Sequence, residues 1–589
     1  MSDPQLVLAA RVQAALAAAF GQEYANEDPV IRPSQFADFQ ANVALPLAKR
    51  LGRKPRDVAN EIVAALDVAG VCDRVEVSGP GFLNLTLSDE WIAAQTQAAH
   101  EDRRLGVPAV QRPQTLVVDY SAPNIAKEML AHHIRTTIVG DAFCRAAEFM
   151  GHQVIRQNHV GDWGTQFGML IEHLLDVGED SAAAEQLETS PNIFYQAARV
   201  KFDSDAAFAE RSRQRVVRLQ GGDAETRRLW HEIVELSKSY FANVYQRLDV
   251  TLTHDDLAGE SMYNDMLDDI CAELEDKGIA TVSEGALCVF LDGFTGREGK
   301  PVPLIIRKSD GGYGYATTDL AAIRHRALTL HADRIIYVIG APQALHLKMV
   351  FETARQAGWL DGGKGGGPEG QGGGKSTEPF HAAIGSVLGA DGKILRTRSG
   401  EPIKLITLIE EGIERAEKVI EDRGYDDRTR QEIAEAVGIG AAKYADLSTA
   451  RDSDYVFDLD RMLALQGNTG PYLQYAVARI RSIFRKAELA AADATGPIVV
   501  AEPAERALAL QLLGFGGALD ALLGEVTPHK LCAYIYALAD AYTTFYENCP
   551  VLKAPDEKIR ASRLALCAVT MRTLETGLTL LGVPTPERM

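Results

Sequence analysis

The chain has 589 residues, of which 46% are hydrophobic and 24% are charged. This length is too great for one hydrophobic core and predicts two to four domains of ordinary globular composition. The net charge of −20 argues against indiscriminate binding to nucleic acid. From Arg461 onwards, however, 13 Lys and Arg residues balance 12 Asp and Glu residues, so this near-neutral segment permits a local contact with RNA.

No apolar run approaches the roughly 20 residues that are needed to span a bilayer. The N-terminus lacks the pattern of an export signal. The seven cysteines are scattered and form no Cys-x-x-Cys pair, which indicates reduced thiols rather than disulfides or a zinc site. We therefore expect a cytoplasmic protein that has no contact with a membrane and no protein-bound metal site.

Residues 1–110 are predicted to form a small α+β domain. Helices are expected over Leu6–Phe20, Asn42–Leu51 and Pro55–Leu66, the last with proline at an early helical position. Arg74–Leu87 is typical of two strands joined by a turn at Gly79-Pro80-Gly81.

Residues 111–405 alternate short β-branched runs with helical segments, which predicts a parallel sheet. The expected strands are Thr115–Asp119, Val154–Asn158, Leu287–Leu291 and Arg334–Ile339. Residues 361–375 form a low-complexity glycine tract, which we expect to be a flexible insertion because ordering so much glycine costs backbone entropy.

Residues 406–589 are predicted to be helical almost throughout. Leu- and Ala-rich periodic segments recur over Leu508–Leu523, Leu531–Tyr546 and Ile559–Leu581. An all-α bundle is the simplest structure for such a pattern.

The segment Asp119–Arg135 (DYSAPNIAKEMLAHHIR) carries the clearest functional signal. It follows the buried strand predicted at Thr115–Asp119, is broken by Pro123, and has a helical apolar period from Ile125 onwards. A strand that ends in a polar turn and opens a helix is where α/β sheets bind anions, because free N–H groups and the positive end of the helix dipole face that edge. The carboxylate, amide and lysine side chains there indicate a nucleotide together with a cationic small molecule.

Five ordered motifs make the chain resemble arginyl-tRNA synthetases of the bacterial type, which are class I aminoacyl-tRNA synthetases. They are Asp119–Lys127, Gly161–Gly168 (GDWGTQFG), Tyr315–Asp319 (YATTD), Gly467–Tyr475 (GNTGPYLQY) and Pro586–Met589 (PERM). The resemblance covers nearly the whole length. It implies an α/β fold with three domains: an N-terminal tRNA-contacting domain (1–110), a Rossmann-type parallel-sheet catalytic domain (111–405) and a helical anticodon-binding domain (406–589).

The same resemblance implies a function, namely ATP-dependent attachment of L-arginine to tRNA(Arg) through arginyl-adenylate. ATP would be a substrate and Mg²⁺ would accompany its phosphates. The family is mostly monomeric, so a cytoplasmic monomer is expected.

Recognition of arginine needs carboxylates, because a guanidinium has five donors in a rigid plane and a permanent charge. By resemblance, the side-chain pocket is lined by Asp319, Tyr315, Glu260 and Asp119, and the amino-acid head group is held by Asn124 and Gln343. Taken alone, Asp319 would favour a helix N-cap, since Thr317, Thr318 and Asp319 all cap well. The family pattern favours the pocket.

The nucleotide site departs from the family pattern. The resemblance places ATP against Ala122, Pro123, Asn124, Ile125, Ala126, Lys127, Glu128, Met129, Leu130, Ala131 and His132. The family signature His-x-Gly-His falls on Leu130-Ala131-His132-His133, where only His133 matches. Leu130 cannot donate a hydrogen bond, and the side chain of His132 should crowd the adenine.

Several interpretations of this departure stay open. His132 could supply the missing donor, or adenylation could be weakened by a few kcal/mol, the usual value of one such donor. The chain could instead be a non-catalytic paralogue that binds tRNA or arginine. His132 could also be a histidine without a role.

The second class I signature, Lys-Met-Ser-Lys-Ser, is replaced by Asp391–Gly400 (DGKILRTRSG). Many arginyl enzymes carry a lysine just before the first signature instead, and Lys127 fits that position. Lys393, Arg396 and Arg398 can still clamp pyrophosphate in the transition state. A basic hairpin turn around Asp391-Gly392 describes the same residues and does not exclude that role.

Contacts with tRNA are expected in both terminal domains. Phe82 would stack on a flipped-out base and Asn84 would read its edge. Tyr472 and Arg479 would border the anticodon stem and loop. For Phe82 and Tyr472, a role in the core is an equally open interpretation.

Overall fold

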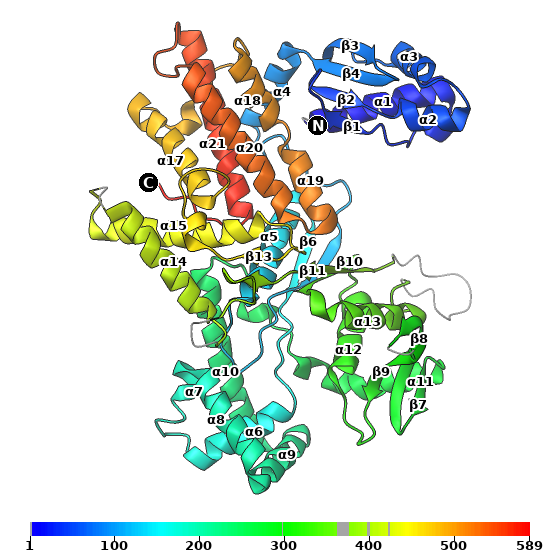
Figure 1. Cartoon of the computed structure of the whole chain (residues 1–589), viewed down its shortest axis with the longest axis vertical. Coiled ribbons are helices and arrows are strands. Elements are labelled where there is room, and N and C mark those ends of the chain that lie inside the picture. Colours follow the sequence, from blue (N-terminus) through cyan, green and yellow to red (C-terminus); the bar gives the residue numbers. More distant parts are fainter. Residues whose placement is uncertain (1–2, 297–298, 362–375, 397–400, 422–423) are drawn as a thin grey trace. The chain divides into compact units, whose positions relative to one another are not determined.

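The computed structural model describes residues 3–296, 299–361, 376–396, 401–421 and 424–589. They pack into two compact units (Figure 1). The first comprises the residues up to Ala109 together with Ala464–Leu580 and Pro584–Met589, and the second comprises Val110–Leu463 with Leu581–Val583.

The second unit is built on a four-stranded sheet in the order β11-β10-β5-β6, in which every pair is parallel. Its strands are β5 (Thr115–Asp119), β6 (Gln153–Gln157), β10 (Arg334–Gly340) and β11 (Glu378–Ile384). The chain runs outward from β5 to β6 on one side and from β10 to β11 on the other. The strand order therefore reverses between β5 and β10, and ligands of parallel α/β sheets bind at the carboxyl ends beside such a reversal.

The predicted strand at Leu287–Leu291 exists, but its assignment to the parallel sheet is wrong. It lies in β8 (Ala286–Thr295), the middle strand of a separate antiparallel sheet with β7 (Ala280–Ser283) and β9 (Pro301–Arg307). Glu284 and Gly285 join β7 to β8 with φ values of 52° and 80°. Two left-handed residues form the tight turn that makes neighbouring strands antiparallel.

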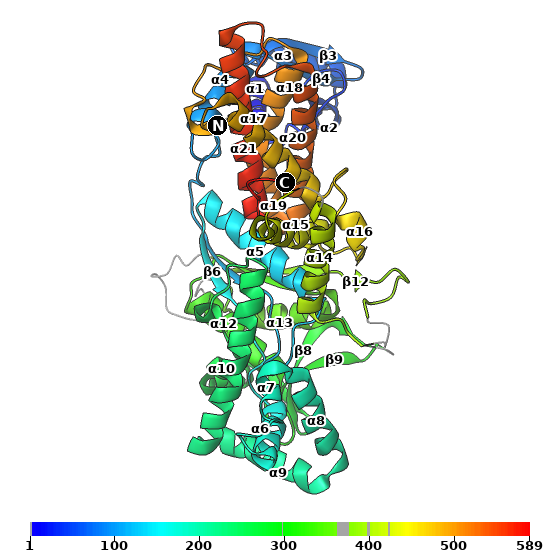
Figure 2. The same cartoon turned by 90° about the vertical axis from the view of Figure 1, so that its left-hand side faces the viewer.

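Helices pack on this framework (Figure 2). α5 (His133–Met150) packs on β5, β6 and β10, whereas α12 (Tyr315–Leu328) packs on β10 and β9, and α13 (Ala344–Gln356) packs on β11. α11 (Leu267–Asp276) packs on α12.

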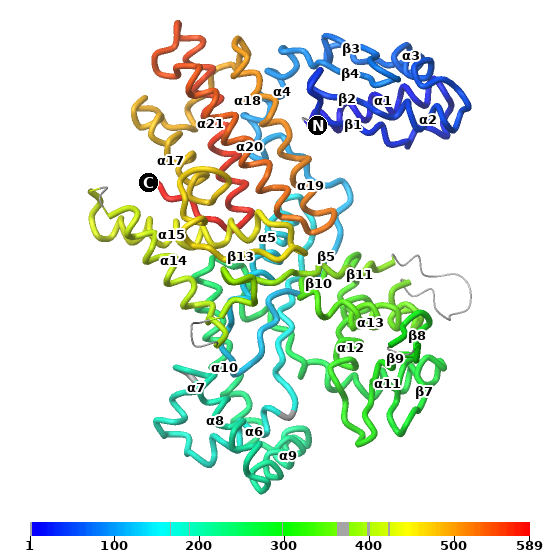
Figure 3. The backbone as a smooth tube through the Cα atoms, in the orientation of Figure 1, coloured from blue at the N-terminus to red at the C-terminus, as the bar shows by residue number. Residues whose placement is uncertain are grey.

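A helical insertion separates β6 from β7 and forms the group that contains α6 to α9 in Figure 3. Its helices are α6 (Thr165–Val177), α7 (Gln186–Thr189), α8 (Pro191–Ser204), α9 (Ala206–Gln220) and the long α10 (Ala224–Arg247). α10 supplies Ser237, Tyr240 and Tyr245 to the turn that follows β5.

Residues 406–463, expected with the C-terminal bundle, pack in the second unit. α14 (Leu405–Ile420) and α15 (Asp427–Leu447) pack on each other, and α15 also packs on α5. There Arg135 and Asp446 form an ion pair whose side chains are both fully buried. The short strand β13 (Tyr455–Val456), followed by α16 (Leu459–Met462), pairs in parallel with β12 (Val387–Leu388).

The N-terminal part of the first unit is the expected α+β domain. Its antiparallel sheet has the order β1 (Ile31–Pro33), β2 (Phe39–Ala41), β4 (Phe82–Leu87) and β3 (Cys72–Ser78). The helices are α1 (Pro4–Phe20), α2 (Ala44–Leu51), α3 (Pro55–Ala65) and α4 (Asp89–Glu101). The predicted turn between the strands needs glycine at Gly81, where φ is 140° and a Cβ would lie 2.9 Å from the carbonyl oxygen of Pro55.

The C-terminal part of the first unit is helical, as expected. It contains α17 (Gly470–Ala487), α18 (Pro503–Leu512), α19 (Phe515–Glu525), α20 (Pro528–Asn548) and α21 (Glu557–Leu580). The helix predicted over Leu508–Leu523 is two helices, because the chain breaks at Leu513 and Gly514.

One stretch, Pro503–Glu525, is long and apolar enough to cross a membrane by length and composition, contrary to our expectation of none. It consists of the two separate helices α18 and α19. Leu508, Leu519 and Leu522 are fully buried within the protein. Apolar core helices pass the same test, so this stretch is weak evidence for a membrane span.

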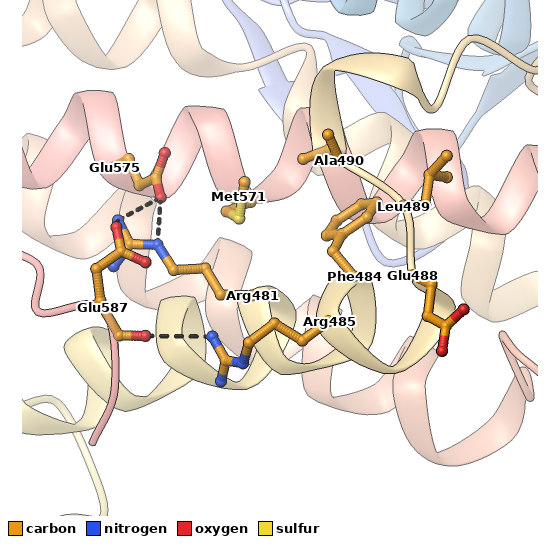
Figure 4. Close-up of a pocket in the computed structure, with 10 residues that line it drawn as sticks. Arg481, Phe484, Arg485, Glu488, Leu489, Ala490, Met571, Glu575 and Glu587 are labelled. Carbon is orange, nitrogen blue, oxygen red and sulfur yellow. Dashed lines mark hydrogen bonds and ion pairs between the residues drawn. The ribbon is translucent and has the colours of Figure 1, made fainter.

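α17 holds the last residues of the chain against its own surface. Gln474 donates to the carbonyl oxygen of Pro584 at 2.7 Å, Arg481 donates to those of Thr585 and Pro586 at 3.2 and 2.6 Å, and Arg485 donates to that of Glu587 at 3.4 Å. Figure 4 shows Arg481 between Glu575 and Glu587 at one end of a cavity of about 650 Å³.

Candidate active site

The turn after β5 holds an unusual backbone. Ser121, Ala122 and Ala126 have φ values of 71°, 50° and 58°, in the left-handed region that non-glycine residues rarely adopt. Such residues cost of order 1–3 kcal/mol each and persist only where the surroundings enforce them.

Side chains from three other segments enforce this turn. Ser121 Oγ lies 2.9 Å from Thr137 Oγ1 and 2.8 Å from the Tyr245 hydroxyl. Asn158 Oδ1 accepts from the Ala122 amide at 2.9 Å, and Ser237 Oγ accepts from the Ala126 amide at 2.9 Å. The predicted ATP-contacting segment is therefore held in one conformation at the carboxyl edge of the sheet.

The two residues predicted to hold the amino-acid head group follow the two central strands. Asn124 is exposed and its backbone forms a parallel bridge with Gly161. A Cβ at position 161 would lie 2.9 Å from Asn124 Oδ1, so glycine leaves that amide its space. Gln343 is exposed in the 3-10 helix Ala341–Gln343, directly after β10.

Three carboxylates converge at this edge. Glu260 begins the 3-10 helix Glu260–Met266, and Asp319 lies in α12. Ser261, the second residue of that 3-10 helix, holds the Asp162 carboxylate. Its amide donates to Oδ1 at 2.8 Å and its hydroxyl donates to Oδ2 at 2.6 Å. Burial, and then the charges of Asp162 and Asp319, raise the pKa of Glu260 to about 7.

No lysine or arginine of the described chain pairs with Asp162, Glu260 or Asp319. The ion-pair partners of Asp319 are two imidazoles: His346 Nε2 lies 2.6 Å from Oδ2, and His159 Nε2 lies 3.9 Å from Oδ1. Within the described ranges, the Glu260 carboxylate has neither a hydrogen bond nor an ion pair. A partly buried group of acids without a lysine or arginine partner favours a cationic ligand, because unpaired buried charge is costly.

Asp119, the third predicted carboxylate, already has a cation. Its Oδ2 lies 2.8 Å from Nη1 of Arg326, and both side chains are buried. Arg326 Nε also donates to Gln157 Oε1 at 2.6 Å. Asp119 Oδ1 is buried and accepts no hydrogen bond from the described residues.

Tyr315 is the first residue of α12 and is 69% exposed. Its ring packs edge-on against His346 with centroids 4.9 Å apart. The N-cap of this helix is Gly314, so the alternative interpretation of Asp319 as an N-cap is wrong. Asp319 lies one turn inside the helix.

In the altered signature, α5 begins at His133. The Leu130 amide donates to His133 Nδ1 at 2.9 Å, and the Leu130 carbonyl oxygen lies 3.3 Å from the same nitrogen. The shorter bond favours the neutral tautomer that carries its proton on Nε2. Burial and the neighbouring His132 lower the pKa of His133 to about 4, so this ring is neutral at pH 7. His132 is exposed, and its ring centroid lies 4.1 Å from that of His133.

The later part of the predicted ATP segment, residues 128–131, is hydrogen-bonded to residues 403–405, which follow the second signature. Glu128 Oε1 lies 2.8 Å from Lys404 Nζ. The Ala131 amide donates to the Ile403 carbonyl at 2.8 Å, and the Leu405 amide donates to the Met129 carbonyl at 2.8 Å. Pro123 and Ile125 are buried, and Lys127 Nζ lies 4.2 Å above the ring of Tyr195.

Lys393 and Arg396 are exposed on the predicted basic turn. The Gly389 amide donates to the Lys393 carbonyl at 2.7 Å, and Gly392 takes a φ of 73°. The hairpin interpretation therefore describes this backbone. Arg398 lies outside the described residues, as do residues 362–375 of the glycine tract.

The residues predicted to contact tRNA lie in the first unit. Asn84 is buried on β4, where it accepts from Gln40 Nε2 at 2.8 Å and donates to Ser78 Oγ at 3.0 Å, so its amide is occupied within the sheet. Phe82 is half-buried two residues earlier on the same strand.

On α17, Tyr472 is half-buried with its hydroxyl 3.3 Å from Thr543 Oγ1. The guanidinium of Arg479 lies 4.1 Å above the ring of Tyr546.

Sequence reasoning missed His159, His346 and Arg326. Each lies within 4 Å of a predicted carboxylate. They come from separate segments, so only the folded chain shows these contacts. The sole local signal was the position of His346, one helical turn after Gln343.

Comparison with known proteins gives the fold and the site their class. A family model described as "tRNA synthetases class I (R), catalytic domain" matches residues 95–459. Models described as "DALR anticodon binding domain" and "Arginyl tRNA synthetase N terminal domain" match residues 473–589 and 6–87.

Whole-chain relatives narrow the class. The chain is 65% identical to "Arginine--tRNA ligase" of Thermobifida fusca, covering 100% of both chains, and 49% identical to that of Streptomyces avermitilis, covering 98% of both. The crystal structure of arginyl-tRNA synthetase from Plasmodium falciparum superposes with a TM-score of 0.84 at 29% identity, covering 99% of both chains. The chain belongs to the class I arginyl-tRNA synthetase family, and the fold class predicted from its sequence is confirmed.

Proposed function

We propose that the protein attaches L-arginine to tRNA(Arg) in two steps. ATP and arginine first give arginyl-adenylate and pyrophosphate, and the arginyl group then passes to the ribose at the 3′ end of the tRNA. The observation that carries this proposal is the acidic group of Glu260, Asp162 and Asp319, which has no lysine or arginine partner in the part of the chain that the structure describes.

Asp319 and Glu260 bind the guanidinium, and Tyr315 covers the open side of the pocket. A planar cation with five donors suits two carboxylates better than a lysine ammonium does, because it can donate to both within one plane. Asn124 and Gln343 hold the carboxylate and amine of the amino acid at the ends of β5 and β10. Asp119 contributes through its free oxygen, Oδ1.

Residues Ala122–His132 bind ATP at the carboxyl edge of the sheet, before the start of α5. His133 donates from Nε2 to a phosphate oxygen as charge develops there, since its ring is neutral and its proton is directed by the Leu130 amide. Lys127 supplies a positive charge beside the phosphates. Lys393, Arg396 and Arg398 clamp the pyrophosphate from the basic turn.

Mg²⁺ enters with the triphosphate. Among the described residues, no group of three or more His, Cys, Asp or Glu side chains is arranged so that it could hold a metal ion. Phosphate oxygens and water can supply most ligands of Mg²⁺, so the protein needs no dedicated cage. When bound, the ion neutralises phosphate charge.

The altered signature is compatible with activity. Leu130 uses its backbone amide to orient His133, so this position serves the site without a histidine side chain. His132 is exposed and stands next to His133, from where it can supply the missing donor. We therefore favour the active enzyme over a binding paralogue.

The N-terminal and C-terminal domains bind the tRNA, with Phe82, Asn84, Tyr472 and Arg479 as contacts. Asn84 must exchange its bonds to Gln40 and Ser78 to read a base. The protein thus has three functional domains. Residues 406–463 pack with the catalytic residues, which favours placing the boundary between the catalytic and anticodon-binding domains near 463 rather than 405. We expect a cytoplasmic monomer.

The test is arginine-dependent ATP–pyrophosphate exchange with tRNA(Arg) present, followed by charging of that tRNA with labelled arginine. We expect both reactions with arginine and neither with lysine. Folded protein that supports neither reaction would make the chain a binding paralogue.

A further inference from the structure

The carboxylate of Asp319 is held by a side chain to which the reaction above assigns no role. His346 lies in the first turn of α13, and its Nε2 is 2.6 Å from Asp319 Oδ2. The side chains of His346 and Asp319 are 17% and 25% exposed, so the bond is shielded from water without being sealed. A hydrogen bond to a carboxylate in such surroundings is short and strong.

This bond determines which oxygen of Asp319 meets the ligand. Because Oδ2 accepts from His346, the carboxylate cannot rotate freely, and Oδ1 is the oxygen that lies 3.9 Å from Nε2 of His159. Tyr315 packs edge-on against the His346 ring at 4.9 Å, so the imidazole is itself held in place. Tyr315, His346 and Asp319 thus form one wall, drawn from α12 and α13.

We infer that His346 is a positioning residue for arginine selection, which fixes the Asp319 carboxylate so that Oδ1 accepts from the guanidinium in the plane of that cation. The inference rests on the proposed function, because it assumes that Asp319 binds arginine. His346 itself touches neither the substrate nor the reacting atoms.

The alternative role for His346 is purely structural, as a bond that ties α12 to α13. The two roles differ in what they change. A structural bond contributes to the stability of the fold and leaves the affinity for arginine unchanged. A positioning bond acts on arginine affinity and leaves ATP affinity unchanged, since Asp319 lies on the amino-acid side of the site.

The experiment compares His346→Ala and His346→Gln with the unmodified chain. The KM values for arginine and for ATP are measured by pyrophosphate exchange with tRNA, and the affinity for arginine alone is measured by calorimetry. For His346→Ala we expect about a tenfold weaker arginine affinity, the usual effect of losing a hydrogen bond to a charged group, with the KM for ATP within about twofold. His346→Gln retains a donor and restores most of the affinity.

The matched control is His152→Gln, at the amino end of β6 and on the opposite edge of the sheet from the site, where arginine affinity should not change. Urea midpoints of all variants report folding. Unchanged arginine affinity in folded His346→Ala would overturn the inference and leave the proposed function standing. Equal weakening toward arginine and ATP would also overturn it. An unmodified chain that neither binds arginine nor exchanges pyrophosphate would instead remove the proposed function, and the inference with it.

Discussion

Glu260 carries a proton near neutral pH because it is buried beside two other acids, which raise its pKa to about 7. A guanidinium favours the ionised form of this group. Arginine binding must therefore release a proton below pH 7, and the affinity must fall as the pH falls through that value.

We predict that the dissociation constant of arginine, measured by calorimetry without ATP, is nearly constant above about pH 7.5. Below pH 7 it should rise toward tenfold per pH unit, the limit for one proton. In Glu260→Gln the affinity should be lower at pH 8 and the slope should largely disappear. A slope unchanged by this substitution would contradict the assignment.

His133 leads to a second prediction about a single residue. Its pKa of about 4 keeps it neutral over the working pH range, so it acts as a hydrogen-bond donor rather than as a charge. His133→Ala should slow pyrophosphate exchange about 100-fold, the lower end for one transition-state donor, with little change in the KM for ATP. Its own titration should leave no trace between pH 6 and 8. A rate within threefold of the unmodified chain would mean that His132 or the basic turn stabilises the transition state instead.

At the scale of elements, Arg135 connects α5 to the segment that carries β13. Its Nη1 donates to the Ser453 carbonyl at 2.8 Å, and its Nε lies 3.1 Å from Asp446 in a fully buried pair. β13 then pairs with β12, which leads into the basic turn. The start of the helix that bears His133 and the start of the turn that bears Lys393 are thereby linked.

Removing one partner of this pair leaves an uncompensated buried charge. Arg135→Ala and Asp446→Ala should each lower the free energy of unfolding by about 3–5 kcal/mol, whereas the double change Arg135→Met with Asp446→Leu should cost less than either. Urea denaturation followed by circular dichroism measures this. Single changes that cost under about 1 kcal/mol would show that the pair is open to water.

Elements whose cause is local could be predicted from the sequence. Thr115–Asp119 is a β-branched run that packs on both faces, and it is β5 at the predicted bounds. The turn at Glu284-Gly285 shows why β8 was assigned to the wrong sheet. Left-handed turns of this kind usually carry Asn-Gly or Asp-Gly, and Glu284 does not fit that pattern, so the sequence did not predict the hairpin. The break between α18 and α19 at Gly514 escaped for a similar reason, because the apolar period continues across it.

The candidate site divides in the same way. Asp119 and Asn124 could be placed because Asp119 ends β5 and Asn124 lies in the turn after it. The contacts of Asp319 with His159 and His346, and of Asp119 with Arg326, could not be predicted, since they join segments that only tertiary packing brings together. The pKa of Glu260 depends on these neighbours and was equally hidden.

At the scale of the molecule, the first unit brings the N-terminal domain and the C-terminal helices together. Arg506 of α18 donates to both carboxylate oxygens of Asp38 at 2.7 and 2.9 Å, and to Asp89 at 2.6 Å. A planar fork bound at both oxygens is specific to arginine.

Arg506→Met should loosen this attachment. We predict faster amide hydrogen exchange in β4, by about 5- to 30-fold for a loss of 1–2 kcal/mol, and a higher KM for tRNA with an unchanged KM for arginine. Arg506→Lys should give an intermediate result. Arg560→Met removes a partly exposed arginine of α21 and serves as the control. Equal exchange in the Arg506 and Arg560 variants would contradict the prediction.

The central claim is that acids at the carboxyl ends of the strands hold a permanent planar cation. Calorimetry with arginine and with citrulline, which replaces the guanidinium by a neutral urea of the same shape, tests it most directly. We predict that the unmodified chain binds citrulline at least about 100-fold more weakly than arginine, and that Asp319→Asn removes most of this difference. Equal binding of both ligands by the unmodified chain, or the same preference in Asp319→Asn, would contradict the account.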